Sequence, residues 1–373
     1  ELLRAVARRL RECMRDTDTL SRQGGDEFLV VLGDLRDVGA AGQVVDKILA
    51  CFSRPFQING QELGISLSVG VSIFPDDAED FDSLLKMADT AMYYAKEAGR
   101  DTYRFFDQRM NVNAVERLLI ANGLRRALVQ NEFILHFQPQ MEISSGRVTG
   151  AEALVRWQSP DAGLVMPGRF ISVAEESGLI VPLGEWVLNE ACREEVAWQL
   201  RCCPEVTVAV NLSAIQFKRG DMEQTVMGAL ARSGLDPRCL ELELTESLLL
   251  HDTEHVLAAV RRLKSLGIRL SIDDFGTGYS SLAYLKRFAV DRLKIDQSFI
   301  RDLGDDADAA SIVRAIIQMA RSLNLHTVSE GVEEDRQMEY LRAFHCDEAQ
   351  GYFCARPMPA AEFAAWLDAR SVP

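Results

Sequence analysis

Two hydrophobic patterns divide the chain at about one third of its length. In the first part, apolar residues at helical spacing predict helices at residues 2–10, 39–53 and 81–98. Alternating apolar residues predict strands at residues 28–32 and 65–73. This mixture indicates a small α+β domain over residues 1–106, with a sheet that we expect to be antiparallel.

A continuous helical pattern connects this part to the rest of the chain. It runs from residue 107 to residue 130 and contains no proline. The pattern therefore predicts a stiff connecting helix rather than a flexible linker. We expect the following domain to take in the end of this helix and to span residues 113–367.

From residue 132 onward, strand patterns recur about every 30 residues and helical patterns separate them. Alternation of this kind implies parallel strands with right-handed crossovers. Eight such units predict an α/β fold, a (β/α)₈ TIM-like barrel. A doubly wound open sheet is the alternative, but no GxGxxG motif follows a strand. The expected strands are 133–137, 148–155, 206–212, 240–244, 268–272, 292–295, 327–328 and a weak one around Ala349.

Polar residues interrupt these strands in a common phase. Alternate residues of a barrel strand point inward, and active sites lie at the carboxyl ends of the strands. Five strands therefore each direct a polar side chain into the same end of the barrel. Arg156 shares the inward phase of its strand. The phase of Glu330 and Gln350 is ambiguous. The five inward residues are Glu152, Asn211, Glu243, Asp273 and Lys294.

This set of side chains indicates a metal site. So many carboxylates cannot stay ionised together without cations, and oxygen ligands suit Mg²⁺, Mn²⁺ or Ca²⁺ rather than zinc. Asp273 and Asp274 could serve two ions, as in two-metal phosphodiester hydrolysis, and Lys294 could orient the water or offset charge. Each residue alone could be a solvated strand-end group, but five inward polar groups without ligands would be costly.

A glycine-containing loop follows Asp273 and runs to Ser281. Its glycines permit the backbone conformations of a lid or hinge, although a plain strand-to-helix connection is the alternative. Glu246 could anchor this loop by a hydrogen bond. Equally, Glu246 fits the N-terminus of a helix, where the helix dipole favours a carboxylate.

Composition and charge exclude several classes of protein. The chain has 373 residues, 47% of them hydrophobic and 26% charged, which is typical of a soluble globular protein of two domains. Its net charge of −15 argues against DNA or RNA polymers as partners, although metal ions would still let it bind a phosphodiester. There is no membrane-spanning apolar run in this segment and no signal peptide.

The cysteines predict a reducing environment. The eight cysteines show no CxxC spacing, so we expect reduced, buried thiols in a cytoplasmic protein. The adjacent Cys202 and Cys203 could be redox-active, but a loop position without such a role is the alternative. The full-length protein could still be tethered to a membrane through an upstream region.

The segment Glu152-Ala153-Leu154-Val155-Arg156-Trp157 resembles the signature of the EAL family of cyclic-di-GMP phosphodiesterases. The resemblance covers about residues 113–367. Further motifs follow in the same order: Phe137-Gln138-Pro139, Ala174-Glu175-Glu176-Ser177-Gly178, Asn211-Leu212-Ser213, Glu243-Leu244-Thr245-Glu246, Asp273-Asp274-Phe275-Gly276-Thr277-Gly278, Lys294-Ile295-Asp296, Glu330-Gly331-Val332-Glu333 and Gln350-Gly351-Tyr352. Phe137, Ser329 and Glu334 depart from the usual residues, and none of these changes removes a ligand.

The resemblance implies hydrolysis of cyclic-di-GMP to linear pGpG with two Mg²⁺ or Mn²⁺ ions. The motif positions match the ligands of one ion with Glu152, Asn211, Glu243 and Asp273, and those of the other with Asp273, Asp274 and Glu330. They match catalytic groups with Lys294, Glu330, Gln350 and the loop anchor Glu246. They match substrate contacts with Gln138, Leu154, Arg156, Asp274 and Gln350.

The first domain resembles the GGDEF domain of diguanylate cyclases. Gly24-Gly25-Asp26-Glu27-Phe28 is the signature, on a glycine turn that lets backbone approach phosphates. Lys96 and Arg100, four apart and expected on one helix face, match the triphosphate contacts of that family. Arg15 and Asp18 match its inhibitory RxxD site, although a local surface ion pair explains them equally well.

The same resemblance predicts that the GGDEF part is incomplete. The family's first strand and helix, with a further metal-binding aspartate and guanine contacts, should precede residue 1. Asp26 alone cannot hold a metal ion, so we expect no cyclase activity from this chain. GTP could bind at this part in the full-length protein.

Two other functions are compatible with parts of the pattern. A non-catalytic cyclic-di-GMP receptor could signal through helix 107–130, but such proteins usually lack metal ligands that are all present here. A barrel glycosidase could use two carboxylates, but the Asn, Asp-Asp and Lys at successive strand ends argue against it. We expect a homodimer that forms through the barrel or the connecting helix.

Overall fold

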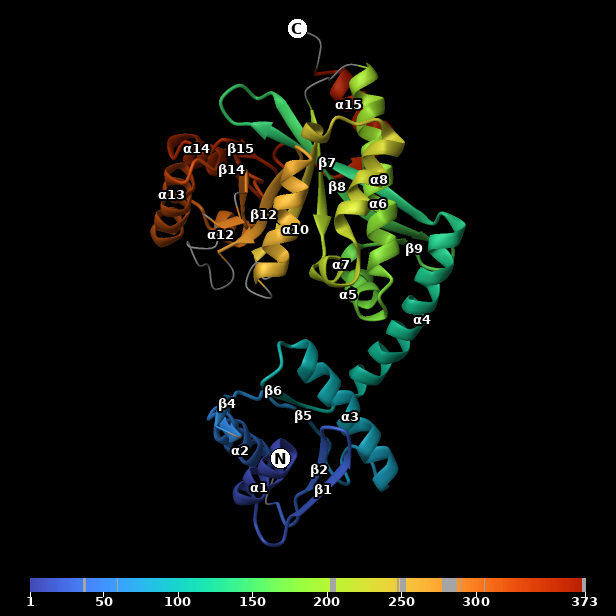
Figure 1. Cartoon of the computed structure of the whole chain (residues 1–373), viewed down its shortest axis with the longest axis vertical. Coiled ribbons are helices and arrows are strands. Elements are labelled where there is room, and N and C mark those ends of the chain that lie inside the picture. The colour runs from blue at the N-terminus through green and yellow to red at the C-terminus, as the bar shows by residue number, and fades with distance from the viewer. Residues whose placement is uncertain are drawn as a thin grey trace. The chain divides into compact units, whose positions relative to one another are not determined.

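The computed structural model divides the chain into two compact units, Glu1–Leu119 and Ile120–Pro373 (Figure 1). It describes all residues except 36–37, 59, 202–205, 247, 249–252, 277–286, 289, 305 and 371–373. Cys202, Cys203 and the glycine-rich loop from residue 277 to 281 lie outside the described residues. None of the described helices is long and apolar enough to cross a membrane.

The first unit combines short two-stranded sheets with helices. Antiparallel pairs form between β1 and β2 and between β3 and β4, but β5 and β6 are parallel. The expected antiparallel sheet is therefore wrong for β5 and β6, because helix α3 lies between them and carries the chain back. The elements are α1 (Leu2–Cys13), β1 (Thr19–Gly24), β2 (Glu27–Val31), α2 (Val38–Phe52), β3 (Phe56–Ile58), β4 (Gln61–Leu63), β5 (Ser68–Val71), α3 (Phe81–Glu97) and β6 (Thr102–Phe105).

A small core holds α1 against α2 and β3. Val6 and Leu10 of α1 pack with Ile48 and Phe52 of α2, because apolar residues three and four apart share one helix face. Arg9 lies over the ring of Phe56 at 3.4 Å from its centroid, so its guanidinium covers the edge of this core. Helix α4 (Gln108–Gln130) follows β6 and coincides with the expected connecting helix.

The second unit contains a closed barrel of eight strands with helices around it (Figure 1). The strand order is β7-β15-β14-β13-β12-β11-β10-β8, and β8 pairs with β7 to close the ring. These strands are β7 (Phe133–Glu142), β8 (Val148–Ser159), β10 (Thr207–Leu212), β11 (Leu240–Thr245), β12 (Arg269–Phe275), β13 (Arg292–Ile295), β14 (His326–Ser329) and β15 (Glu348–Ala349). Two short strands, β9 (Gly163–Val165) and β16 (Met358–Pro359), extend the sheet.

Helices connect the barrel strands and cover their outer faces. Most of them follow one strand and lead to the next, as a strand-helix repeat requires. They are α5 (Pro167–Ser177), α6 (Ile180–Arg201), α7 (Ala214–Arg219), α8 (Met222–Ser233), the 3₁₀ turn η1 (Pro237–Cys239), α10 (Thr253–Ser265), α12 (Gln297–Arg301), α13 (Ala307–Ser322), α14 (Asp335–Ala343) and α15 (Ala360–Asp368).

The first barrel strand runs opposite to the others. β7 is antiparallel to both β8 and β15, whereas the other pairs around the ring are parallel. The prediction of parallel strands is therefore wrong at β7. Only residues 143–147 separate β7 from β8, and a parallel crossover needs a dozen residues or more. A turn with Gly146 at φ +71° joins the two strands as a hairpin.

Apolar and polar residues alternate across the wall of the barrel. On β11, Leu240, Leu242 and Leu244 are fully buried and belong to the large core between strands and helices. The alternate residues Glu241 and Glu243 are also buried, and both reach cations on β13 inside the barrel. The barrel interior is therefore polar, and the apolar core lies outside it.

One buried carboxyl lies in this outer core, away from the barrel interior. Glu195 of α6 is 0% exposed, its Oε1 accepts a hydrogen bond from Gln199 Nε2 at 3.2 Å, and its Oε2 has no partner. Burial raises the pKa of Glu195 to about 8. Between its unfolded pKa of 4.5 and about 8, the folded chain binds more protons than the unfolded chain, so Glu195 lowers stability as pH rises through this range.

We therefore expect Glu195→Gln to stabilise the chain at pH 9 by an amount of the order of a few kcal/mol, and much less at pH 5. Chemical denaturation at both pH values measures the difference. Glu185→Gln on the same helix is the matched control, because that side chain is exposed. An equal effect of Glu195→Gln at pH 5 and pH 9 would contradict the assignment.

Candidate functional site

A buried lysine lies at the centre of an acidic cluster inside the barrel. Lys294 of β13 is 0% exposed. Its Nζ lies 2.6 Å from Glu330 Oε1, 2.7 Å from Glu243 Oε2, 3.0 Å from Asp273 Oδ1 and 3.5 Å from Glu152 Oε2. Carboxylates from three strands and one strand-end loop thus converge on the ammonium group of β13, and for the three strand residues this is what the alternation along the strands predicts.

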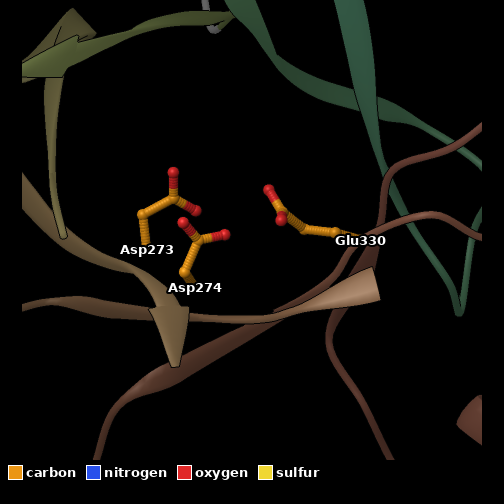
Figure 2. Close-up of side chains that lie close together, drawn as sticks. All are labelled: Asp273, Asp274 and Glu330. Atoms are coloured by element: carbon orange, nitrogen blue, oxygen red, sulfur yellow. The ribbon is translucent and has the colours of Figure 1, made fainter. Parts of the chain in front are cut away.

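Two adjacent aspartates enter the same site from β12. The register of β12 against β13 shifts between Ile272 and Phe275, and Asp274 has φ +55°. Such a bulge redirects side chains that would otherwise alternate across the sheet. One carboxylate oxygen each of Asp273, Asp274 and Glu330 lies within 4.8 Å of the others, and the three groups could hold a metal ion. Figure 2 shows these carboxylates facing one another.

Glu152 of β8 is held by two amides. Its Oε1 accepts a hydrogen bond from Asn211 Nδ2 at 2.5 Å, and its Oε2 accepts one from Gln350 Nε2 at 2.5 Å. Gln350 Nε2 also lies 3.2 Å from Oε1 of Gln138, which is the register partner of Glu152 on β7. The carboxylate of Glu152 is therefore fixed in position by neutral donors as well as by Lys294.

Two glycines allow the segments that follow β14 and β15 to pass close to neighbouring parts of the chain. Gly331 follows Glu330 with φ +67°, and a Cβ there would lie 2.5 Å from Gln297 Cβ. Gly351 follows Gln350, and a Cβ there would lie 2.1 Å from the carbonyl oxygen of Val332. Side chains at these positions would displace backbone, which explains why glycine follows both site residues.

Electrostatics in this cluster are dominated by crowded carboxylates. Burial raises the pKa of Glu330 to about 8 and that of Asp274 to about 6, and neighbouring Asp273 adds to both shifts. Burial and the Glu152 charge raise the pKa of Glu243 well above its usual value. Burial opposes a charge on Lys294, but the surrounding carboxylates raise its pKa well above the ordinary lysine value.

Glu152 is the exception among these carboxyls. Burial alone would raise its pKa, but the Lys294 charge and the hydrogen bonds from Gln350 and Asn211 lower it below the ordinary value. Of Glu152, Glu243, Asp274 and Glu330, Glu152 is therefore the one whose ionised form the surroundings favour. Glu152 is thus held as an anion, whereas Glu330 can exchange a proton near neutral pH.

The donor set fits divalent metal ions. Glu243 Oε1 and Asp273 Oδ1 are buried and accept no hydrogen bond, although Asp273 Oδ1 lies at ion-pair distance from Lys294. Oxygen atoms of this kind are suited to coordinate a hard cation. Among the described residues, the group that could hold a metal contains no His and no Cys. The side chains therefore match magnesium or manganese better than zinc.

The predicted substrate contacts line the same end of the barrel. Glu152, Leu154 and Arg156 alternate on β8 and so face the same side. Arg156 is 5% exposed, its Nη1 donates to the Val155 carbonyl at 2.9 Å, and burial lowers its pKa. Gln138 Nε2 donates to the Ala355 carbonyl at 3.2 Å.

Glu246 anchors the chain after the two aspartates. Its Oε2 accepts a hydrogen bond from the backbone N–H of Gly276 at 3.1 Å. Gly276 has φ +101°, a conformation that other residues rarely adopt. The loop-anchoring interpretation of Glu246 therefore has a direct contact in its favour, and it connects β11 to the end of β12.

The GGDEF residues are placed in the first unit. Gly24 ends β1, Gly25 has φ +48°, and Asp26 and Glu27 follow at the exposed turn of the β1–β2 hairpin. Arg22 Nη2 donates to the Gly25 carbonyl at 2.6 Å and holds this turn.

One expectation for this unit is wrong, and the inhibitory role of Arg15 and Asp18 stays a prediction. Lys96 lies in the last turn of α3, but Arg100 lies beyond its end with φ +62°, so the two do not share a helix face as expected. Gly99, at φ +105°, ends the helical path between them. Asp18 is buried, and its Oδ2 atom accepts a hydrogen bond from the backbone N–H of Arg15 at 2.8 Å. This hydrogen bond is a local contact between residues three positions apart.

Sequence reasoning missed three residues that touch the cluster or support it. Asp296 contributes to the raised pKa of Asp274, and Gln140 Nε2 donates to Gln350 Oε1 at 3.0 Å. Arg292 lies two residues before Lys294 and occupies the same face of β13. The signal for Gln140 and Arg292 was present, because each shares the inward phase of a residue that was identified.

Comparisons with known proteins agree with the fold. Residues 121–357 match the EAL domain model, and residues 1–102 match the model for the diguanylate cyclase GGDEF domain. The chain is 44% identical over 98% of its length to the bifunctional diguanylate cyclase/cyclic di-GMP phosphodiesterase MucR of Pseudomonas aeruginosa, and covers 53% of that protein. It is 39% identical over 98% of its length to the cyclic di-GMP phosphodiesterase PdeR of Escherichia coli, and covers 55% of it.

Solved structures show the same likeness in the second unit. The PaMucR phosphodiesterase in complex with c-di-GMP has 45% identity and a TM-score of 0.64, with 66% of this chain and 99% of that chain covered. The EAL domain of Mycobacterium smegmatis DcpA has 34% identity and a TM-score of 0.55, with 64% and 97% covered. The chain thus spans about half the length of the two curated relatives. It belongs to the EAL domain family, and it carries a GGDEF region before its EAL domain.

Proposed function

We propose that this chain hydrolyses cyclic-di-GMP to linear pGpG in its EAL domain, in a reaction that depends on two Mg²⁺ or Mn²⁺ ions. The observation that carries the proposal is the convergence of four carboxylates on the buried Lys294, with Asp274 beside them. A site of this charge favours an anionic substrate only when cations accompany it. The named relatives act on this dinucleotide, which supports the choice of substrate.

The charge of the cluster supports two ions rather than one. With all five carboxyls ionised and Lys294 charged, the cluster would carry a formal charge of −4, which two divalent cations would neutralise. Bound ions of this kind activate water and offset the phosphate charge. We assign Glu152, Asn211, Glu243 and Asp273 to one ion and Asp273, Asp274 and Glu330 to the other.

The protein's own groups then have distinct roles. Hydrolysis adds the water oxygen to phosphorus and breaks one P–O3′ bond of the ring, and the leaving O3′ takes up a proton, so the product has a free 5′ phosphate and a 3′ hydroxyl. Glu330 can accept the proton of the attacking water, and Lys294, whose Nζ lies 2.6 Å from Glu330 Oε1, offsets developing negative charge. Gln350 contacts substrate and water.

The remaining assignments concern the substrate and the loop. We propose that Gln138, Leu154, Arg156 and Asp274 contact the dinucleotide and that Glu246 holds the segment after β12 in place. Arg156 suits a phosphate because its guanidinium presents several donors in one plane. The GGDEF part is proposed to make no cyclic-di-GMP in this chain, and the chain is proposed to act as a cytoplasmic homodimer.

An assay of the purified chain with cyclic-di-GMP tests this function. We expect pGpG to form with Mg²⁺ or Mn²⁺ and to stop when EDTA is added, because the carboxylates alone would repel the phosphate. Separation of nucleotides by chromatography identifies the product. Parallel samples with Ca²⁺ show whether the site distinguishes between hard cations, and parallel samples with GTP should yield no cyclic-di-GMP.

The outcomes separate the proposal from its alternative. Binding of cyclic-di-GMP without turnover in Mg²⁺ and Mn²⁺ would contradict hydrolysis and favour a receptor that signals through the connecting helix. Turnover that persists in EDTA would contradict the metal dependence. Size-exclusion chromatography with light scattering determines whether the chain is a dimer, independently of the assay.

A further inference from the structure

A second cation lies inside the barrel below the acidic cluster, toward the amino ends of most strands. Arg292 is 4% exposed, its Nη1 lies 2.8 Å from Glu241 Oε2, and its Nη2 pairs with Glu348. Glu348 Oε1 lies 3.0 Å from His326 Nε2 on β14. This set of ionic contacts fixes the guanidinium of Arg292 inside the barrel.

One glutamine connects this lower cation to the candidate site. Gln140 of β7 is fully buried, and its Oε1 accepts a hydrogen bond from Arg292 Nη1 at 3.4 Å. Its Nε2 donates to Gln350 Oε1 at 3.0 Å. Gln350 Nε2 in turn donates to Glu152 Oε2 at 2.5 Å. Three hydrogen bonds therefore run in series from Arg292 to the carboxylate of Glu152.

The direction of this series is set by its two ends. A guanidinium can only donate, and an ionised carboxylate can only accept, whereas each amide does both. If the Gln140 amide were reversed, its NH₂ would face the N–H groups of Arg292 and its oxygen would face the oxygen of Gln350. Arg292 therefore orients Gln140, and Gln140 orients Gln350 with its NH₂ toward Glu152.

The reversed direction of β7 places Gln140 one level below Gln138, nearer to Arg292. Gln138 of β7 is the partner of Glu152 at the upper level, and Gln140 is the partner of Gly150 one level below. Gly150 leaves space for the amide, since a Cβ there would lie 3.0 Å from Gln140 Oε1 and 2.8 Å from Thr207 Oγ1. One strand thus supplies a glutamine to the site and a second glutamine to the level beneath it.

We propose that Gln140 is a positioning residue of the metal and substrate site, which acts by fixing the orientation of the Gln350 amide. Within the described part of the chain, the hydrogen bonds of the Gln140 amide go to Gln350 and Arg292 rather than to a proposed metal ligand, so Gln140 acts through Gln350. Without it, Gln350 can rotate and present its oxygen to the Glu152 carboxylate, which repels it. The kinetic part of this inference rests on the proposed function, but the effect on metal affinity does not.

The test starts from Gln140→Met, which keeps the side-chain length and removes the amide. We expect the affinity for Mn²⁺ and the kcat for cyclic-di-GMP each to fall about tenfold, the usual effect of losing a group that orients a ligand, with a smaller change in KM. Titration of free Mn²⁺ by electron paramagnetic resonance measures the affinity. Thr207→Val is the control, because it removes a polar group from the same level of the barrel without breaking the series.

A double-mutant cycle with Gln350→Met shows whether Gln140 acts through Gln350. We expect Gln140→Met to cause no further loss of Mn²⁺ affinity or kcat in the Gln350→Met background, because the target of its positioning is gone. Full additivity of the two losses, or equal losses for Gln140→Met and Thr207→Val, would overturn the proposal.

A second variant and the Mn²⁺ measurement keep the proposal testable if Gln140→Met does not fold or the chain shows no hydrolysis. If Gln140→Met does not fold, Gly150→Ala displaces the amide without removing it, and we expect a loss of Mn²⁺ affinity in the same direction. Unchanged affinity in folded Gly150→Ala would then count against the proposal. If the unaltered chain hydrolyses no cyclic-di-GMP, the proposed function fails, and the Mn²⁺ cycle still decides the role of Gln140.

Discussion

Replacing Lys294 with methionine is expected to reduce kcat for cyclic-di-GMP by more than about 100-fold and to destabilise the metal-free chain by about 3–5 kcal/mol. The variant keeps the length of the side chain but removes the only cation that the described ion pairs bring to Glu152, Glu243, Asp273 and Glu330. The uncompensated carboxylates must then protonate or repel one another. Loss of the ammonium also removes the group that offsets charge in the transition state.

The pH dependence distinguishes this explanation from a packing defect. Loss of Lys294 raises the carboxyl pKa values further, so the variant binds extra protons in the folded state and its deficit in unfolding free energy should shrink as pH falls. Denaturation at pH 5 and pH 8 measures this, with and without Mg²⁺. Lys264→Met is the control, since Lys264 pairs with Asp291 at a partly exposed position. A deficit that is the same at both pH values would contradict the electrostatic account.

Glu152→Ala should reduce turnover by more than about 100-fold, while the chain keeps its fold. A proposed ligand is lost, and losing a metal ligand costs at least as much as losing a residue that orients one. The substitution also leaves the Asn211 and Gln350 amides without their shared acceptor. Removal of one crowded carboxylate relieves repulsion on Glu243, which limits the loss of stability.

Product formation and Mn²⁺ affinity measure the effect of Glu152→Ala, and calorimetry measures whether cyclic-di-GMP still binds. Glu142→Ala provides a matched control, because Glu142 ends β7 near the loop of the β7–β8 hairpin and is partly exposed. We expect the control to keep the turnover of the unaltered chain. Hydrolysis by Glu152→Ala at the unaltered rate would remove Glu152 from the proposed metal site.

Much of the site could be predicted because strand alternation is a strict rule inside a barrel. The side chains of Glu152, Asn211, Glu243 and Lys294 sit within regular strands, so their neighbours determine which side they face. The same rule fails for Glu330 and Gln350, which follow β14 and β15. Those strands have four and two residues, too few for a pattern to establish a phase.

Other features depend on geometry that the pattern of residues does not encode. Asp274 reaches the site through a bulge and a left-handed backbone conformation, whereas alternation alone would turn it away. The direction of β7 follows from the short connection to β8, which periodicity in each strand does not reveal. The end of α3 before Arg100 likewise depends on the local backbone at Gly99.

The hairpin at the start of the barrel also has a consequence for folding kinetics. β7 and β8 are neighbours in sequence, and hairpins form within about 1–10 μs. The ring closes where β15 meets β7, and the Gln140–Gln350 hydrogen bond across that junction joins residues 210 positions apart. Contacts between such distant residues form slowly. We therefore expect the proposed hydrolysis of cyclic-di-GMP to return during refolding only with this last pairing, so a partly assembled barrel would leave the dinucleotide intact.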